Sequence, residues 1–102
     1  MFLDIHAHST KRSIFVYAPK PEKRYEVART RTFPGILDEM SDVFNLRNCD
    51  FNNTKAKENC ARLGIYNLYK LQDSYTVETS CYGFEVKNNF RLRQQGAADE
   101  TV

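Results

Sequence analysis

The stretch Leu3–Ser9, LDIHAHS, lies close to the start of the chain and combines an apolar strand pattern with two histidines. Its apolar residues predict a short buried strand, which delivers His6 and His8 at its carboxyl end. Because residues two apart on a strand project from the same face, both imidazoles can reach one metal ion. The heptapeptide therefore predicts a strand of a sheet with a metal-binding group beside it.

The next residues predict a second strand and a helix. Segment 13–18, SIFVYA, is rich in β-branched and aromatic residues and is followed by prolines, as expected of a strand. Segment 20–32 is polar, contains proline and is expected to be a loop. Pro34 stands where a first-turn proline would, and apolar residues follow it at helical spacing. We therefore expect a helix over about 34–40 whose apolar stripe packs against the core.

The second half of the chain predicts one clear strand. Residues 61–71 fit either a helix or an irregular strand. Residues 74–79, SYTVET, predict a strand with Tyr75 in the core and Glu78 on the opposite face. The mixture of strands and helix favours an α/β fold. Residues 94–102 have no apolar periodicity and are expected to form a disordered tail.

Composition narrows the possible functions. The chain has 102 residues, so it is one domain at most, and no apolar run reaches the length of a membrane span. The net charge of +2 argues against a nucleic-acid partner. Three cysteines without CxxC spacing indicate free thiols in a reducing compartment, and we expect no secretory signal.

Basic residues concentrate in one segment. Residues 11–31 contain seven Lys or Arg against two Glu. This segment is either a solvated loop or a surface that attracts an acidic partner or substrate.

The histidine motif resembles two unrelated enzyme families. The pattern D-x-H-x-H-S is similar to the opening motif of the PHP metallophosphoesterases, in which both histidines, here His6 and His8, bind metal. That family continues with a Ser-Asp-Gly turn. In this chain residues 10–17, TKRSIFVY, run directly into the second predicted strand. The PHP resemblance therefore covers six residues.

A longer resemblance points to the cytosolic carboxypeptidases, members of the zinc metallocarboxypeptidase superfamily. DIHAHSTKRSIFVYA is similar to that family's Asp-Leu-His-Gly-His-Ser segment and the strand that follows it. Four further blocks resemble family segments in the same order, so that the similarity covers roughly residues 3–83: FPGIL (33–37), FNLRNCDF (44–51), KAKENCAR (55–62) and SYTVETS (74–80). The resemblance implies that residues 1–93 are the C-terminal half of a mixed-sheet α/β zinc carboxypeptidase domain.

The resemblance also implies roles for individual residues. It makes His6 a zinc ligand and Glu78 the carboxylate that activates water. Glu78 taken alone would fit a solvated strand acid better, and it is the surrounding SYTVETS block that favours the catalytic role. It makes His8 a neighbour of the site that faces substrate. Arg62 and Lys57 match basic family positions and can bind a carboxylate. The implied substrates are C-terminal or branched glutamates on acidic protein tails such as those of tubulin, in the cytoplasm.

One part of the implied zinc site is missing from the chain. The superfamily takes two further zinc ligands from a His-x-x-Glu pair, and this sequence contains only two histidines and no such pair. We therefore expect the chain by itself to be inactive and to require the remainder of the catalytic domain or a partner chain. The alternative is a non-catalytic scaffold or interaction piece that keeps part of the fold.

Overall fold

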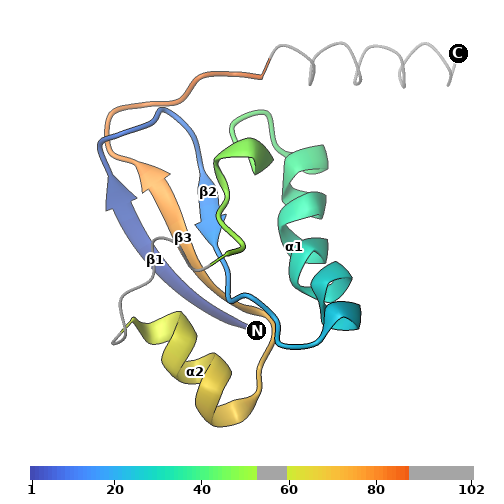
Figure 1. The fold of residues 1–102 in the computed structure, drawn as a ribbon. Helices are drawn as coiled ribbons and strands as arrows, with labels where there is room; N and C mark the ends of the chain where they lie inside the picture. Colours follow the sequence, from blue (N-terminus) through green and yellow to red (C-terminus); the bar gives the residue numbers. More distant parts are fainter. Residues whose placement is uncertain (53–59, 88–102) are drawn as a thin grey trace, which may run out of the picture.

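The computed structural model describes residues 1–52 and 60–87 (Figure 1). Three strands form one mixed sheet in the order β1–β3–β2, with β1 parallel and β2 antiparallel to the central strand. The strands are β1 (Phe2–His8), β2 (Phe15–Tyr17) and β3 (Ser74–Ser80). The predicted mixed α/β architecture is therefore confirmed, whereas the expected domain end at 93 and the tail 94–102 lie outside the described residues.

Two α-helices pack on opposite faces of the sheet. α1 (Val27–Met40) follows the short 3₁₀ helix η1 (Arg24–Glu26), and α2 (Ala61–Tyr69) precedes β3. The Tyr75 hydroxyl contacts α1, whereas the hydroxyl of the next residue, Thr76, contacts α2. Since successive strand residues alternate between faces, α1 and α2 must cover different sides of β3.

The predicted start of the first helix was wrong. α1 begins at Val27 rather than Pro34, so that most of the expected loop 20–32 is helical. Two threonines of this stretch satisfy their hydroxyl groups within the helix by bonding to carbonyls one turn back. Thr30 Oγ1 donates to the Glu26 carbonyl at 3.2 Å, and Thr32 Oγ1 donates to the Ala28 carbonyl at 2.7 Å.

Pro34 lies inside α1 and frees one carbonyl of the helix. Proline has no N–H, so it cannot donate to the carbonyl of Thr30, four residues earlier. The Tyr75 hydroxyl donates to that carbonyl instead, at 2.7 Å, from the start of β3. Tyr75 is 0% exposed and Thr30 is 2% exposed, so both partners are dry. The carbonyl that Pro34 leaves without a helical donor is therefore the point at which α1 is hydrogen-bonded to the sheet.

The hydrophobic core lies between the α1 face of the sheet and the segment after α1. Val16, Ala18, Phe44 and Tyr75 are its fully buried members. The short 3₁₀ helix η2 (Leu46–Asn48) closes this side. The expected packing of the helix stripe is confirmed in part, because Phe33 and Leu37 pack on this core while two other members, Ile36 and Met40, are exposed.

Two further expectations changed. β1 was expected to be buried, but it is an outer strand whose apolar residues Leu3 and Ile5 are 42% and 68% exposed. The stretch 61–71 fitted either a helix or a strand, and its residues Ala61–Tyr69 form α2. Lys70 caps this helix in the left-handed conformation, at φ 54°. The second strand is shorter than predicted, because only 15–17 pair with β3.

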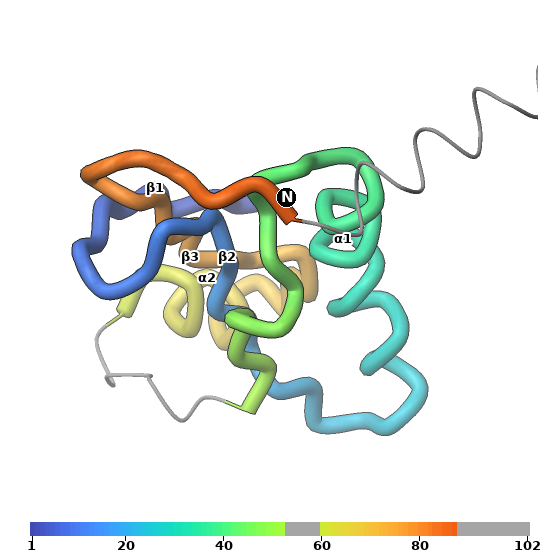
Figure 2. The backbone as a smooth tube through the Cα atoms, turned by 90° about the horizontal axis from the view of Figure 1, so that it is seen from above, coloured from blue at the N-terminus to red at the C-terminus, as the bar shows by residue number. Residues whose placement is uncertain are grey.

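The segment after β3 passes back over the loop that follows β1 (Figure 2). The Glu85 N–H donates to the Arg12 carbonyl at 2.8 Å, and the Lys87 N–H donates to the Asp42 carbonyl at 2.9 Å. The Lys87 ammonium also pairs with Asp38 at 2.9 Å. These bonds tie the end of the described chain to both the β1–β2 loop and the end of α1.

Removing the Tyr75 hydroxyl should destabilise the fold because the Thr30 carbonyl would remain buried without a donor. We expect Tyr75→Phe to lower the free energy of unfolding by about 1–3 kcal/mol in urea titrations. In a Pro34→Ala background the cost should shrink, because the introduced alanine can supply the missing helical N–H. Equal costs in both backgrounds would contradict the coupling, and Tyr82→Phe, which removes an exposed hydroxyl bond, serves as the control.

A buried thiol should make the fold less stable in alkali. Cys49 lies against the core, where its sulfur accepts the Val16 N–H at 3.3 Å, and burial raises the Cys49 pKa from 9.0 to about 11. The unfolded thiol ionises first, so stability present below pH 9 is lost as the pH rises toward 11. We expect Cys49→Ala to flatten this loss by an amount on the order of 1–2 kcal/mol, measured by unfolding at pH 8 and pH 11. An unchanged slope would contradict the assignment.

Candidate active site

His6 and Glu78 are neighbours across the two parallel strands. The β1–β3 register pairs them directly, so both side chains leave the same face of the sheet. Neighbouring strands lie about 4.8 Å apart, which places an imidazole beside a carboxylate. Glu78 is also paired with Phe15 of β2, which supplies an apolar wall on its other side. The register therefore brings together the two residues on which the predicted chemistry depends.

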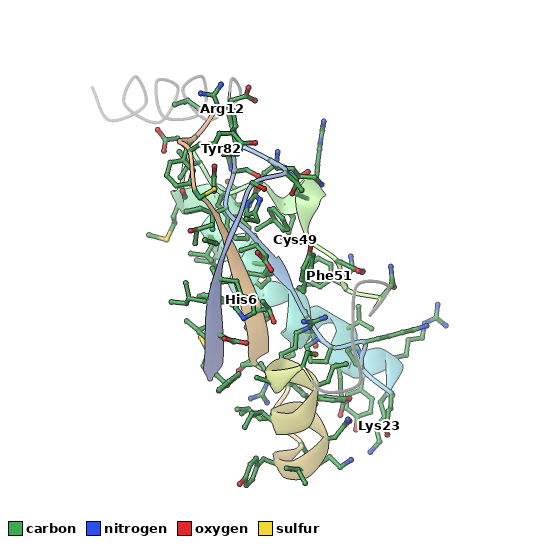
Figure 3. All side chains as sticks on the ribbon, turned by 90° about the vertical axis from the view of Figure 1, so that its left-hand side faces the viewer. His6, Arg12, Lys23, Cys49, Phe51 and Tyr82 are labelled. Carbon is green, nitrogen blue, oxygen red and sulfur yellow. The ribbon has the colours of Figure 1, made fainter. Side chains whose placement is uncertain are left out.

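A carboxylate orients the ring of His6. Asp4 lies two residues earlier on the same face of β1, and its Oδ2 is 2.9 Å from His6 Nε2. A ring that donates its Nε2 proton to a carboxylate keeps its lone pair on Nδ1, the arrangement common for metal-bound histidine. The His6 side chain is 51% exposed and lies on the outer strand (Figure 3). The ring is thus oriented and open to a ligand.

His8 has a different environment. Its Nε2 lies 3.1 Å from the Ser13 carbonyl, while Nδ1 lies 3.4 Å from the Lys11 N–H and 3.3 Å from the Thr10 hydroxyl. The ring also packs edge-on against Phe15 at 4.8 Å between centroids. Both nitrogens of His8 are therefore engaged in closing the loop after β1. In this conformation His8 has no nitrogen left for a metal shared with His6.

The described residues supply only part of a metal site. Zinc in proteins takes three or four nitrogen, sulfur or oxygen ligands. Within 1–52 and 60–87 no group of three or more His, Cys, Asp or Glu side chains could hold a metal ion. The donor set at this position is the His6 imidazole with the carboxylates of Asp4 and Glu78 beside it. It fits one nitrogen ligand of zinc and leaves the others to residues outside this set.

Arg62 reaches the same face of the sheet from α2. It is 3% exposed, and its Nη1 donates to the Thr76 hydroxyl at 3.0 Å. Its guanidinium lies over the Tyr17 ring, 5.4 Å from the centroid, and its backbone carbonyl accepts the Ser74 hydroxyl at 2.8 Å. The Arg62 Nε is buried and has no hydrogen-bond partner within the described parts of the chain. A buried guanidinium with a free donor is suited to a carboxylate ligand.

Arg62 and Glu78 both lie close enough to Tyr17 for their charges to affect its pKa. The pKa of Tyr17 is raised, first by burial and then by the negative charges of Glu78 and Asp50, whereas the Arg62 charge lowers it. Each of these groups is therefore close enough to influence one phenol. The site combines a carboxylate, a buried guanidinium and an oriented imidazole on one face.

Some expected features lie elsewhere. Lys57 falls outside the described residues, so its predicted role in carboxylate binding stays a prediction. A groove of about 660 Å³ lies between the β1–β2 loop and the segment after β3, with Lys11, Arg12 and Glu85 in its lining. It includes neither His6 nor Glu78. The His6 side chain is 51% exposed, so the candidate site is open to solvent at His6.

Sequence reasoning missed the residues that hold Arg62. Thr76 and Tyr17 position the guanidinium from two different strands, and no local pattern links them to α2. The alternation within SYTVETS does place Thr76 on the Glu78 face, which is the one signal available.

The chain is similar to curated cytosolic carboxypeptidases. Cytosolic carboxypeptidase 4 of Homo sapiens is 30% identical over 96 residues, covering 81% of this chain and 9% of the relative. Cytosolic carboxypeptidase 2 of Danio rerio is 31% identical over 85 residues, covering 81% and 12%. The chain thus spans about a tenth of the length of the curated relatives it matches. No family model matches the chain.

Among residues 1–52 and 60–87, no helix has the length and hydropathy needed to cross a membrane.

If Arg62 serves to bind a ligand, its positive charge should not contribute to the stability of the fold. No carboxylate of the described residues forms an ion pair with Arg62, so its burial is poorly compensated. We expect Arg62→Met, similar in volume and apolar, to leave the free energy of unfolding unchanged or to raise it by up to about 2 kcal/mol. Urea titration measures this, with Arg62→Lys as the charge-preserving control. A loss above about 2 kcal/mol would assign Arg62 a structural role.

Proposed function

Because this chain forms part of a cytosolic carboxypeptidase-like domain, we propose that it supplies half of the active site of a zinc-dependent carboxypeptidase. The observation that carries the proposal is the β1–β3 register, which pairs His6 with Glu78 on one face of the sheet. The remaining ligands come from the rest of the catalytic domain or from a partner chain. The activity belongs to that assembled protein.

In the proposed reaction the two paired residues have separate tasks. His6 would hold the metal, with its ring oriented by the contact between Nε2 and the Asp4 carboxylate. Zinc, when bound, supplies Lewis-acid activation of the scissile carbonyl and of water. Glu78 accepts the proton of the attacking water and returns it to the leaving amine. A carboxylate on a rigid central strand, one strand away from the ligand, can make this transfer without rearrangement.

The proposed substrate is a glutamate at a protein C-terminus or on a side-chain branch. Arg62 is the candidate group for its carboxylate, since the buried Nε and the planar guanidinium can form two charge-assisted bonds. Lys57 is proposed to assist. The basic segment 11–31 would attract glutamate-rich tails such as those of tubulin.

The proposed compartment is the cytoplasm. The relatives are named as cytosolic proteins. Cys49, Cys60 and Cys81 are all free thiols, as expected in a reducing compartment.

The decisive experiment measures glutamate release by the assembled protein. We join the chain to the portion of human cytosolic carboxypeptidase 4 that precedes its matched segment, and supply a peptide with a glutamate-rich tail. Glu78→Gln should lower kcat by about 10²–10⁴-fold, because the proton acceptor is lost, while zinc content is unchanged. Arg62→Lys should mainly raise KM, because the planar fork is lost.

Two controls give this experiment its meaning. Glu85→Gln removes an exposed carboxylate from the same chain and should leave kcat and KM unchanged. A folded, zinc-loaded assembly that releases no glutamate would overturn the proposal in favour of a scaffold. Tight stoichiometric zinc binding by the chain alone would instead favour the two-histidine phosphoesterase arrangement, which requires His8 to leave its loop contacts.

A further inference from the structure

One face of β3 holds Arg62 at two points before it reaches Glu78. The Ser74 hydroxyl donates to the Arg62 backbone carbonyl at 2.8 Å, and the Thr76 hydroxyl accepts from Arg62 Nη1 at 3.0 Å. Ser74, Thr76 and Glu78 stand two residues apart along the strand, so their side chains leave the same face of the sheet. The strand that positions Glu78 therefore also fixes both the backbone and the side chain of Arg62.

These contacts lie in the interior of the chain. Ser74, Arg62 and Thr76 are all buried, and both partners of each hydrogen bond are described residues. Away from water, a hydrogen bond to a charged group is stronger than the same bond at the surface. The position of Arg62 is thus set by contacts within this chain.

The bond to Thr76 uses one side of the guanidinium and leaves the other side free. Nη1 lies on the opposite side of the planar group from the Nε–H, so the hydroxyl does not contact the edge formed by Nε and Nη2. Nε is buried without a partner, and no hydrogen bond from Nη2 is seen within 1–52 and 60–87. That edge carries two parallel N–H groups, the arrangement that binds both oxygens of a carboxylate.

Tyr17 restricts the tilt of the same guanidinium. Tyr17 is the residue of β2 that pairs with Thr76, and its ring centroid lies 5.4 Å from Arg62 Cζ. An aromatic face attracts a cation and favours a stacked guanidinium. With Thr76 at one edge and Tyr17 against one face, the free edge keeps a single orientation.

We propose that Thr76 is a positioning residue, which holds Arg62 so that its Nε–Nη2 edge binds a substrate carboxylate at a fixed distance from Glu78. This role rests on the proposed carboxypeptidase function. Alternate residues of a strand lie about 6.6 Å apart, so the spacing of Thr76 and Glu78 sets that distance. Thr76 acts through Arg62 and does not itself contact the substrate.

A purely structural role of Thr76 predicts a different result. If its hydroxyl only satisfied a buried guanidinium, its loss would destabilise the fold and leave the affinity of the folded protein for a carboxylate unchanged. Thr76→Val keeps the β-branched shape that suits a strand but removes the acceptor oxygen, whereas Thr76→Ser keeps that oxygen. The two substitutions therefore separate shape from hydrogen bonding.

The binding test uses the 102-residue chain and glutarate, a dicarboxylate without a scissile bond. The Arg62 Nε–H signal in a nitrogen–proton correlation NMR spectrum reports on the free edge, and Arg62→Lys identifies this signal by removing it. We expect glutarate to shift the signal, and the uncharged analogue glutaramide to leave it in place. Thr76→Val should weaken glutarate binding at least about fivefold, the loss expected for one hydrogen bond to a charged group.

Three further variants complete the binding test. Thr76→Ser should bind glutarate like the unmodified chain. Thr32→Val, the matched control, removes a threonine hydroxyl that bonds within α1 and should leave glutarate binding unchanged. Tyr17→Leu removes the aromatic face from a different strand and should also weaken binding, which provides a second test if Thr76→Val does not fold. Circular dichroism verifies that each variant is folded.

The kinetic test uses the assembled protein with a glutamate-tailed peptide. Thr76→Val should raise KM at least about fivefold with little change in kcat, because binding of the carboxylate is lost in the ground state and the transition state alike. Glu78→Gln lowers kcat instead, so the two residues of β3 affect different kinetic constants. Thr76→Ser should restore KM.

Unchanged glutarate affinity in folded Thr76→Val, no recovery in Thr76→Ser, or an Arg62 signal that glutarate does not shift would each overturn the positioning role. Failure of the proposed hydrolysis gives a different pattern. In that case the assembled protein releases no glutamate, while glutarate still shifts the Arg62 signal and Thr76→Val still weakens its binding.

Discussion

The hydrogen bond from the Tyr75 hydroxyl to the Thr30 carbonyl is the contact on which the arrangement of helix and sheet depends. Pro34 makes this bond necessary, because its missing N–H leaves a buried carbonyl inside α1 without its helical donor. Tyr75 is 0% exposed and belongs to the central strand. Its hydrogen bond therefore fixes where along β3 the helix α1 lies, as well as holding the helix against the sheet. Phe33 completes the junction, with its ring 5.3 Å from that of Tyr75.

The opposite face of the same strand carries the candidate site residue Glu78. Alternation along β3 commits Tyr75 and Val77 to the core and leaves Thr76 and Glu78 on the side covered by α2. Anchoring one face thereby positions the other, since a slip of one residue would exchange the two sets of side chains. The register with β1 then places His6 beside Glu78. The Tyr75 hydroxyl and the candidate proton acceptor Glu78 therefore lie on opposite faces of the same strand, and the position of one determines the position of the other.

Several polar and apolar groups have no partner among the described residues. The Arg62 Nε is buried without an acceptor, and the outward backbone groups of β1 face an open edge. Leu3 and Ile5 are apolar yet exposed. The exposure of Leu3 and Ile5 has a simple origin, because among the described residues β1 is an outer strand with a partner on one side only.

Much of this arrangement follows from local residue patterns. Period-two alternation identified the central strand, its core residue Tyr75 and the shared face of His6 and His8, because side-chain direction on a strand depends on sequence position alone. The ordered blocks identified the carboxypeptidase relationship. Local pattern failed for α1, whose start at Val27 is supported by threonine bonds within the helix and by a carbonyl contact from a strand 45 residues away. Local pattern also failed to predict the exposure of β1, because the burial of a strand depends on which other strands surround it.

The sequence by itself therefore determined the strands' faces and the identity of the candidate site residues. Only the tertiary structure decided how those residues meet. Pairing of β1 with β3 is a contact between residues 72 positions apart, and it alone makes His6 and Glu78 neighbours. The fold also gave the two histidines different environments, since loop closure occupies both nitrogens of His8, whereas His6 contacts Asp4 through Nε2 alone. Such differences arise from long-range packing, which no local spacing encodes.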